Sequence, residues 1–326
     1  MENAAMISLH EITSSYRSID STSRSTDHTP SILSSLMNWL EEHDNHCEFN
    51  QIYVFGDSLS DIGNSFTITQ KATGEGLPPS PPYFEGRFSN GLVWIEYLAH
   101  LLKIPSDHHT NYATGGANTD STNTYIPDNP AHLPGLQQQV DAFVTSLNQH
   151  SANPKGLYIV WAGANDYLSG SATNPTEAIA NIIHAVQCLA NVDARHILVA
   201  NLPDLGDLPV ATQNQRSAPF TALTQAHNSG LAAALQTLKP LLKPNTSITL
   251  LDVASLFKRV FDKPTECGFT NIKDIELEQL AHFQGYTDKF FFWDAIHPTT
   301  AAHAVLAQSA FALLQPTSAI LNPTYG

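Results

Sequence analysis

Three residues of this chain, a serine, an aspartate and a histidine, have the types and spacing of a nucleophilic catalyst. Ser58 stands in a tight GDS turn directly after the apolar run 52–55, which is typical of a strand. Near the other end of the chain, Asp294 and His297 lie three residues apart, so the carboxylate can orient the imidazole. A serine becomes a nucleophile where a base can reach it. These residues therefore predict a triad in the chain order Ser58, Asp294, His297.

Two further segments carry groups that could stabilise an oxyanion, and each follows a predicted strand: NYATGGANT (111–119) and WAGANDY (161–167). Attack on an ester carbonyl develops a negative oxygen, which needs preorganised donors. A glycine lets a backbone N–H approach closely, and an asparagine amide is a neutral donor. Gly116 and Asn165, together with the N–H of Ser58, are the predicted donors. The adjacent Gly115 is the alternative to Gly116.

These residues need a scaffold that brings them together, and the chain shows one from residue 51 onward. Apolar runs predict strands at 51–56, 108–113, 157–162, 195–201 and 246–252, and amphipathic stretches predict helices at 91–103, 133–149, 175–192, 217–240 and 299–315. Such alternation is typical of parallel βαβ units with helices on both faces of the sheet. In a doubly wound sheet the loops after the strands meet at one edge, where ligands bind.

Two regions interrupt this alternation. Residues 65–90 are rich in proline and glycine, and we expect them to be irregular and to border the site. Residues 263–292 precede Asp294 and are also expected to be irregular. Their aromatic side chains could either wall an acyl pocket or pack as ordinary core; they are Phe269, Phe283, Tyr286, Phe290, Phe291 and Phe292.

The polar neighbours of the candidate residues are expected to be structural. Asp57 could cap or tune the serine turn, and Asp61 and Asn64 could fix it by hydrogen bonds. Asp166 is expected to cap or brace the loop that carries Asn165. His303 is expected to be an ordinary surface or packed histidine of the last helix.

Composition limits the class of partner. The 326 residues include 15 Lys and Arg against 30 Asp and Glu, a formal net charge of −15. This balance argues against nucleic acid as a partner and against attraction to anionic membranes as the main driving force. No segment approaches the about 20 apolar residues of a transmembrane helix, and residues 1–30 lack the apolar core of a signal peptide. We expect a protein that is cytoplasmic or exported without a cleaved N-terminal signal.

The chain divides into two predicted parts. Residues 1–50 form a polar, flexible leader with a short amphipathic helix at 31–43, and residues 51–326 form one catalytic domain. One disulfide with one free thiol, or three free thiols, would fit the three cysteines Cys47, Cys188 and Cys267. No CxxC motif occurs, and the predicted chemistry needs neither a metal nor an organic cofactor.

Taken together, four segments resemble the sequence blocks of the GDSL lipase/esterase family, also called SGNH hydrolases: FGDSLSDIGN (55–64), NYATGGANT (111–119), GAND (163–166) and WDAIHP (293–298). Residues 86–94 also resemble the GRFSNGxVW stretch of that family, and the resemblance spans about residues 51–312. It implies a flavodoxin-like three-layer α/β/α sandwich with a five-stranded parallel sheet. It also implies that Ser58 is the nucleophile and first oxyanion donor, that Gly116 and Asn165 are the other donors, that His297 is the general base and that Asp294 orients it.

Within the family, these segments look most like the bacterial phospholipase, lysophospholipase and glycerophospholipid:cholesterol acyltransferase branch. The resemblance implies a lipid acyl ester as substrate, at a membrane surface, and an acyl-enzyme that passes to water or to an alcohol such as a sterol. A lysophospholipase A or phospholipase A with acyltransferase activity is the expected enzyme. A general carboxylesterase, carbohydrate esterase or thioesterase of the same family is the alternative. A binding protein with a degenerate site is a different class, which the presence of all five candidate residues disfavours.

Overall fold

The computed structural model of the chain describes residues 49–105, 109–280 and 289–315. The predicted leader helix at 31–43, Cys47, Phe283 and Tyr286 lie outside the described residues. Cys188 and Cys267 are both free thiols. Within the described ranges, no helix has the length and apolarity that crossing a bilayer requires.

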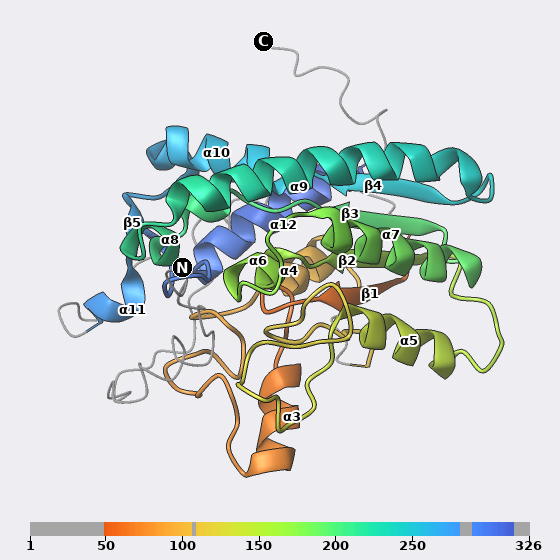
Figure 1. Cartoon of the computed structure of the whole chain (residues 1–326), viewed down its shortest axis with the longest axis horizontal. Coiled ribbons are helices and arrows are strands. Elements are labelled where there is room, and N and C mark those ends of the chain that lie inside the picture. The colour runs from red at the N-terminus through yellow and green to blue at the C-terminus, as the bar shows by residue number, and fades with distance from the viewer. Residues whose placement is uncertain (1–48, 106–108, 281–288, 316–326) are drawn as a thin grey trace.

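A parallel sheet forms the centre of the fold (Figure 1). Its four regular strands are neighbours in chain order: β1 (Gln51–Gly56), β2 (Gly156–Trp161), β3 (His196–Ala200) and β4 (Ser247–Leu251). Every residue of β2 is buried, because helices cover both faces of a central parallel strand. The four strands confirm the predictions made from the apolar runs: β1 has the predicted bounds, and each end of the other three differs by one residue.

The predicted strand at 108–113 was wrong as a regular strand. Among its described residues, Asn111 makes an isolated parallel bridge to Val54, and the Tyr112 N–H donates to the Val54 carbonyl at 2.8 Å. The segment therefore lies along the free edge of β1, and the expected five-stranded sheet has four regular strands plus this bridged segment. The Asn111 side chain accepts the N–H of Ala113 and donates to the carbonyl of Ser60, a local bonding pattern that competes with a strand ladder.

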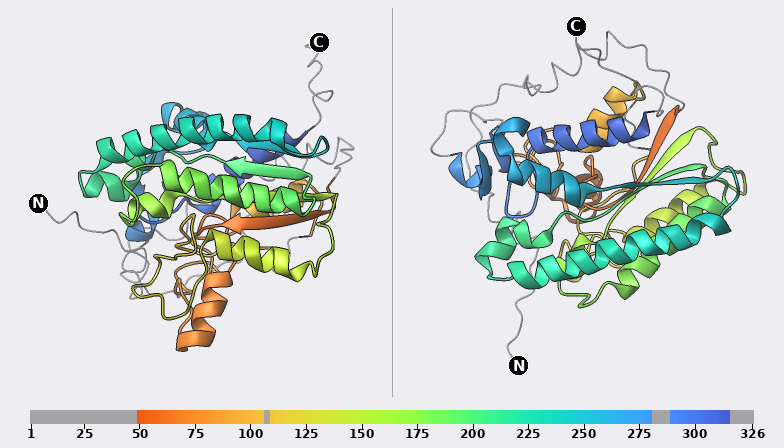
Figure 2. Two further views of the ribbon diagram at one scale, coloured as in Figure 1. Left: turned by 45° about the vertical axis from the view of Figure 1, so that its right-hand side comes forward. Right: turned by 90° about the horizontal axis from the view of Figure 1, so that it is seen from above.

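Helices cover both faces of the sheet and make three layers (Figure 2). One face carries α5 (Leu136–Ser146), α7 (Thr176–Asn191) and α9 (Ser217–Leu238), and the other carries α4 (Trp94–Leu101), α10 (Val253–Asp262) and α12 (Thr300–Leu314). Side chains of β2 alternate between the two layers: Tyr158 and Val160 face the first, and Leu157, Ile159 and Trp161 face the second. The three-layer α/β/α architecture is therefore confirmed.

Several regular elements were not predicted. They are α3 (Asn64–Thr73), α6 (Ala164–Leu168), α8 (Pro209–Gln213), α10, α11 (Glu276–Gln279), β5 (Asn271–Ile275), β6 (Phe290–Phe292) and the short 3₁₀ turns η1 (Leu205–Asp207), η2 (Lys239–Leu241) and η3 (Pro264–Cys267). Residues 65–90 are therefore irregular only after α3, and 263–292 contains a two-stranded parallel sheet of β5 and β6. Helix α3 was not predicted because its sequence, NSFTITQKAT, shows little apolar periodicity.

Phe291 and Phe292, two of the described aromatic residues before Asp294, pack as core. Phe291 makes edge-to-face contacts with Phe257, Phe261 and Phe269, with ring centroids 4.9, 4.9 and 5.3 Å away. Phe292 is fully buried as well, and it contacts Phe261. Side chains this buried cannot line an open pocket, so ordinary packing accounts for them.

Candidate active site

Ser58, His297 and Asp294 form one hydrogen-bonded chain. Ser58 Oγ lies 2.9 Å from His297 Nε2, and His297 Nδ1 lies 2.7 Å from Asp294 Oδ2. Ser58 is 4% exposed and the other two are 0% exposed. The structure thus brings together the three residues that the sequence placed in a triad, in the order of contacts that a nucleophile, a base and an orienting carboxylate require.

The turn that carries Ser58 is held at the end of β1. A side chain on Gly56 would place a Cβ 2.1 Å from the carbonyl oxygen of Trp161, so only glycine fits there. Gln139 of α5 accepts the Gly56 N–H at 2.8 Å and donates to the Gly56 carbonyl at 2.9 Å. The N–H of Ser58 makes no hydrogen bond to any described residue. That N–H is therefore free to bind an oxyanion.

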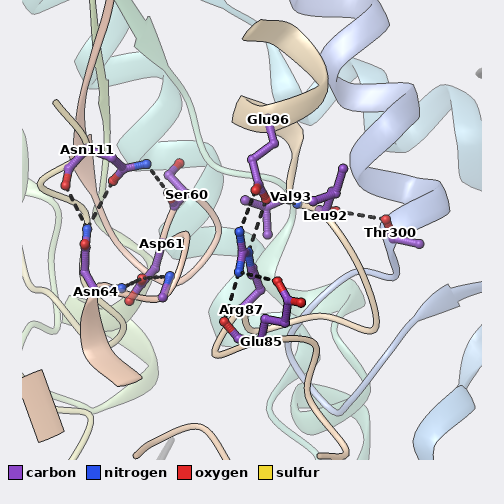
Figure 3. A network of polar contacts seen from close by, with 11 residues as sticks. Ser60, Asp61, Asn64, Glu85, Arg87, Leu92, Val93, Glu96, Asn111 and Thr300 are labelled. Carbon is purple, nitrogen blue, oxygen red and sulfur yellow. Dashed lines mark hydrogen bonds and ion pairs between the residues drawn. The ribbon is translucent and has the colours of Figure 1, made fainter. Parts of the chain in front are cut away.

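Asp61 and Asn64 tie the serine turn to the segment that follows residue 110 (Figure 3). Asp61 accepts the N–H groups of Asn64 at 2.7 Å and of Gly115 at 3.0 Å. Asn64 Nδ2 donates to the carbonyls of Asn111 at 2.8 Å and Ala113 at 2.9 Å. These contacts confirm that the two residues fix the loop by hydrogen bonds. Burial raises the pKa of Asp61, although its hydrogen bonds from Ser65, Gly63 and Gly115 oppose the rise.

The same contacts distinguish the two adjacent glycines. The Gly115 N–H is occupied by Asp61 and by the Ser65 hydroxyl oxygen, 2.8 Å away. The Gly116 N–H makes no hydrogen bond within the described part of the chain. Gly116 has φ 75°, and a Cβ there would lie 2.4 Å from the backbone nitrogen of Tyr125. Gly116 is thus the residue of the pair with a donor to spare.

Asn165 sits at the start of α6, on the loop after β2. Its side chain is 3% exposed, and Nδ2 donates to the carbonyl of Ala117 at 3.0 Å. The next residue, Asp166, accepts the N–H of Thr119 at 3.0 Å and its hydroxyl at 2.6 Å. Asp166 therefore braces this loop, as predicted. Burial raises the pKa of Asp166 to about 6, and the hydrogen bonds from Thr119 oppose that rise.

The turn from Asp294 to His297 is closed by the aspartate itself. Asp294 Oδ1 accepts the N–H of Ile296 at 2.8 Å and of His297 at 2.7 Å. Burial alone would raise the pKa of Asp294, but the charge of His297 and these hydrogen bonds outweigh it and lower the pKa. His303 of α12 is buried rather than on the surface, and burial, with the nearby His297, lowers its pKa to about 3.

Sequence reasoning missed how residues 83–91 contact the site. The Tyr83 hydroxyl donates to Asp294 Oδ2 at 2.8 Å, and the Ser89 hydroxyl donates to the carbonyl of Pro298 at 2.9 Å. Asn90 Oδ1 accepts the N–H of Thr300 at 2.8 Å. The GRFSNG stretch was the signal that marked this segment, but no spacing in the sequence indicates its partners.

An ion pair fixes the segment to α4 (Figure 3). Arg87 Nη2 lies 2.7 Å from Glu96 Oε1, with both side chains about nine-tenths buried. Glu96 also accepts the N–H of Val93 at 3.0 Å, where α4 begins. The Phe88 ring lies 5.1 Å from the His297 ring. Residues 83–91 are therefore fixed to α4 and form part of the wall of the candidate site.

The buried carboxyl of Asp57 makes stability depend on pH. Burial raises the pKa of Asp57 to about 7, against the opposing effects of the Leu59 N–H and of His297. The unfolded chain releases this proton near pH 3.8, whereas the folded chain keeps it until about pH 7. Between those values the folded state binds more protons, so this group's contribution to stability is present at low pH and is lost as the pH rises.

Asp57→Asn is therefore expected to gain stability relative to the wild type as the pH rises. The asparagine keeps an acceptor for the Leu59 N–H but carries no charge. The difference in free energy of unfolding should change by about 1.4 kcal/mol per pH unit between about pH 5 and pH 7. Denaturant titrations across that range measure it, with the exposed Asp128→Asn as a control for losing one carboxylate. A difference that does not vary with pH would contradict the assignment.

The chain is similar to known proteins along most of its length. The family model described as GDSL-like Lipase/Acylhydrolase matches residues 52–310. The chain is 29% identical over 323 residues to a phosphatidylcholine-sterol acyltransferase of Aeromonas hydrophila, covering 83% of this chain and 92% of that protein. It is 30% identical over 288 residues to a thermolabile hemolysin of Vibrio parahaemolyticus, covering 80% of this chain but 63% of the hemolysin. A solved structure of a lipolytic G-D-S-L family protein from Veillonella parvula matches with a TM-score of 0.45 and 13% identity over 80% of this chain and 96% of that chain.

Proposed function

The chain belongs to the GDSL-like lipase/acylhydrolase family, whose chemistry is ester hydrolysis, and from this premise we propose that it is a lysophospholipase A or phospholipase A. The proposed nucleophile is Ser58, the proposed base is His297, and the proposed orienting carboxylate is Asp294. The observation that carries the proposal is the buried hydrogen-bonded chain of these three side chains. No metal or organic cofactor enters the proposed reaction.

The proposed reaction has two steps. His297 Nε2 takes the proton from Ser58 Oγ as this oxygen bonds to the ester carbonyl carbon. Asp294 keeps the Nδ1–H of His297 in place and stabilises the imidazolium that forms. His297 then gives the proton to the leaving alcohol, the carbon–alcohol bond breaks, and an acyl-enzyme remains. Water attacks the acyl-enzyme with His297 again as base, which releases the fatty acid and restores Ser58.

Three donors are proposed to hold the oxyanion of each tetrahedral intermediate. The N–H groups of Ser58 and Gly116 make no hydrogen bond to described residues, so both are available to donate to the developing negative oxygen. Asn165 Nδ2 uses one hydrogen on the Ala117 carbonyl and has a second to offer. Donors fixed by the surrounding structure need no reorganisation during the reaction, which is the source of their effect on the rate.

A lipid acyl ester is the proposed substrate class. The name of the Aeromonas relative states acyl transfer between phosphatidylcholine and a sterol, and this chain spans 92% of that relative. We extend this to an acyl-lipid donor at a membrane surface, with a sterol as an acceptor that competes with water. A general carboxylesterase, carbohydrate esterase or thioesterase is the second candidate, because Phe291 and Phe292 are buried core, which leaves the alternative of an acyl-pocket wall without these two side chains.

A panel of esters tests the proposal. We expect fatty acid release from lysophosphatidylcholine and phosphatidylcholine that exceeds the turnover of short p-nitrophenyl esters, because the lipid chain supplies extra binding energy. The same lipids with cholesterol should also yield cholesteryl ester. Preincubation with a fluorophosphonate should stop every reaction and add one label to Ser58, detected by mass spectrometry. Turnover of short esters alone would replace the proposal by a general carboxylesterase, and a label elsewhere would remove Ser58 from its role.

A further inference from the structure

The geometry points to Tyr83 as a positioning residue that holds Asp294 for its contact with His297. Its hydroxyl donates to Asp294 Oδ2 at 2.8 Å, and this is the same oxygen that binds His297 Nδ1 at 2.7 Å. The inference rests on the proposed function, in which Asp294 orients the base. Tyr83 acts through Asp294 rather than on the substrate.

The Asp294 carboxylate has a complete set of donors. Oδ1 accepts the N–H groups of Ile296 and His297, and Oδ2 accepts the Tyr83 hydroxyl and the His297 ring. Asp294 and Tyr83 are both 0% exposed, so water does not replace a donor that is lost. A buried charged group left with one partner fewer is costly and is free to rotate. Tyr83 thus helps to fix the plane of the carboxylate that aligns the base.

Tyr83 is itself held in place by the segment that carries it. Its N–H donates to the Pro79 carbonyl at 3.1 Å, and its ring packs edge-on against Trp293, with centroids 6.1 Å apart. Trp293 directly precedes Asp294, so ring and hydroxyl both contact the turn that they position. The Ser89 hydroxyl bonds the Pro298 carbonyl on the other side of His297. The segment 83–91 therefore holds the Asp294–His297 turn by hydrogen bonds at both of its ends, to Asp294 and to Pro298.

The hydroxyl also affects the basicity of His297. Asp294 and Ser58 contact His297 directly, and Asp57 and His303 are the other titratable groups near it. Donation from Tyr83 disperses part of the carboxylate charge and so weakens its hold on the imidazolium. Loss of this donor leaves a more concentrated charge beside the ring. The imidazolium then keeps its proton to a higher pH.

Tyr83→Phe, which removes only the oxygen, tests this inference. We expect kcat to fall on the order of 10-fold with little change in KM, and the acidic limb of the pH profile to move up by about 0.5 pH unit. Tyr158→Phe is the matched control, because Tyr158 is equally buried and its hydroxyl donates to the Asn153 carbonyl at 2.9 Å. This contact lies at the amino end of β2, whereas Ser58 follows the carboxyl end of the neighbouring strand β1. The control variant should lose similar stability without moving the acidic limb.

A second measurement does not depend on turnover. Ring-nitrogen NMR of the intact chain follows the titration of His297, which should move to higher pH in Tyr83→Phe and not in Tyr158→Phe. An unmoved titration in Tyr83→Phe would overturn the positioning role, whatever the enzyme activity. If the wild-type chain hydrolysed no ester while this titration still moved, the proposed function would fail and the contact between Tyr83 and the histidine–aspartate pair would stand.

Discussion

Ser58→Ala is expected to lower kcat/KM for every ester substrate by about 10⁴- to 10⁶-fold, because it removes the oxygen of the proposed nucleophile. The Ser58 hydroxyl faces His297 Nε2 at 2.9 Å, and alanine fills nearly the same space. The variant should therefore fold and should keep the other two residues paired. Steady-state kinetics and thermal unfolding of the purified chain measure the two effects separately.

Ser60→Ala is the matched control for this variant. Ser60 lies in the same turn and is fully buried, but its hydroxyl oxygen accepts the indole N–H of Trp94 at 3.0 Å and does not face the histidine. Its loss should cost about 1 to 3 kcal/mol of stability and leave turnover largely intact. A Ser58→Ala chain that kept more than about one-hundredth of the activity would rule out the serine mechanism.

Asn165→Ala is expected to lower kcat by about 10²- to 10³-fold with a smaller effect on KM, because the amide would act mainly on the transition state. The substitution removes the side-chain donor that remains after Nδ2 has bound the Ala117 carbonyl. Steady-state kinetics on one soluble ester measures kcat and KM. Burst kinetics then show whether formation of the acyl-enzyme is the slowed step.

Asn123→Ala separates loss of the donor from disturbance of the loop. Asn123 is also a buried amide, and its Nδ2 donates at 2.8 Å to the Gly115 carbonyl of the same loop. It should lower kcat by less than about 10-fold, since its hydrogen bond supports the loop and not the oxyanion. Equal losses in the two variants would mean that Asn165 acts only by packing the loop.

Most of the fold could be predicted from the sequence because its elements are strongly patterned. The apolar strand at 157–162 and the amphipathic helix at 217–240 appear in the structure as β2 and α9 with nearly the expected bounds. Where the predicted elements were wrong, hydrogen bonds between polar side chains and the nearby backbone explain the difference. Asp61 begins α3 by accepting the N–H of Asn64 and Ser65, so a weakly periodic segment became a helix. The Asn111 side chain took backbone partners that a regular edge strand would have used.

Residue types and chain order were enough to predict which residues form the candidate site, but not which other residues contact them. Ser58, Asp294 and His297 were found because each stands next to a strand or in a turn of recognisable chemistry. The contacts of Tyr83 and Ser89 were not, because they join residues 211 and 209 positions apart. Such pairings depend on how distant segments pack together. The hydrophobic periodicity within one helix or strand does not indicate them.

The separation of 239 positions between Ser58 and His297 also sets an order in time. A ribosome adding about 5 to 20 residues per second needs on the order of 10 to 50 s to make that stretch. Through that interval the turn of Ser58 is made before the proposed base exists, so we expect the growing chain to carry an unactivated serine. If the proposed triad is right, ester turnover requires that the segment carrying His297 has packed against β1, so the onset of turnover would mark the completed assembly of the domain.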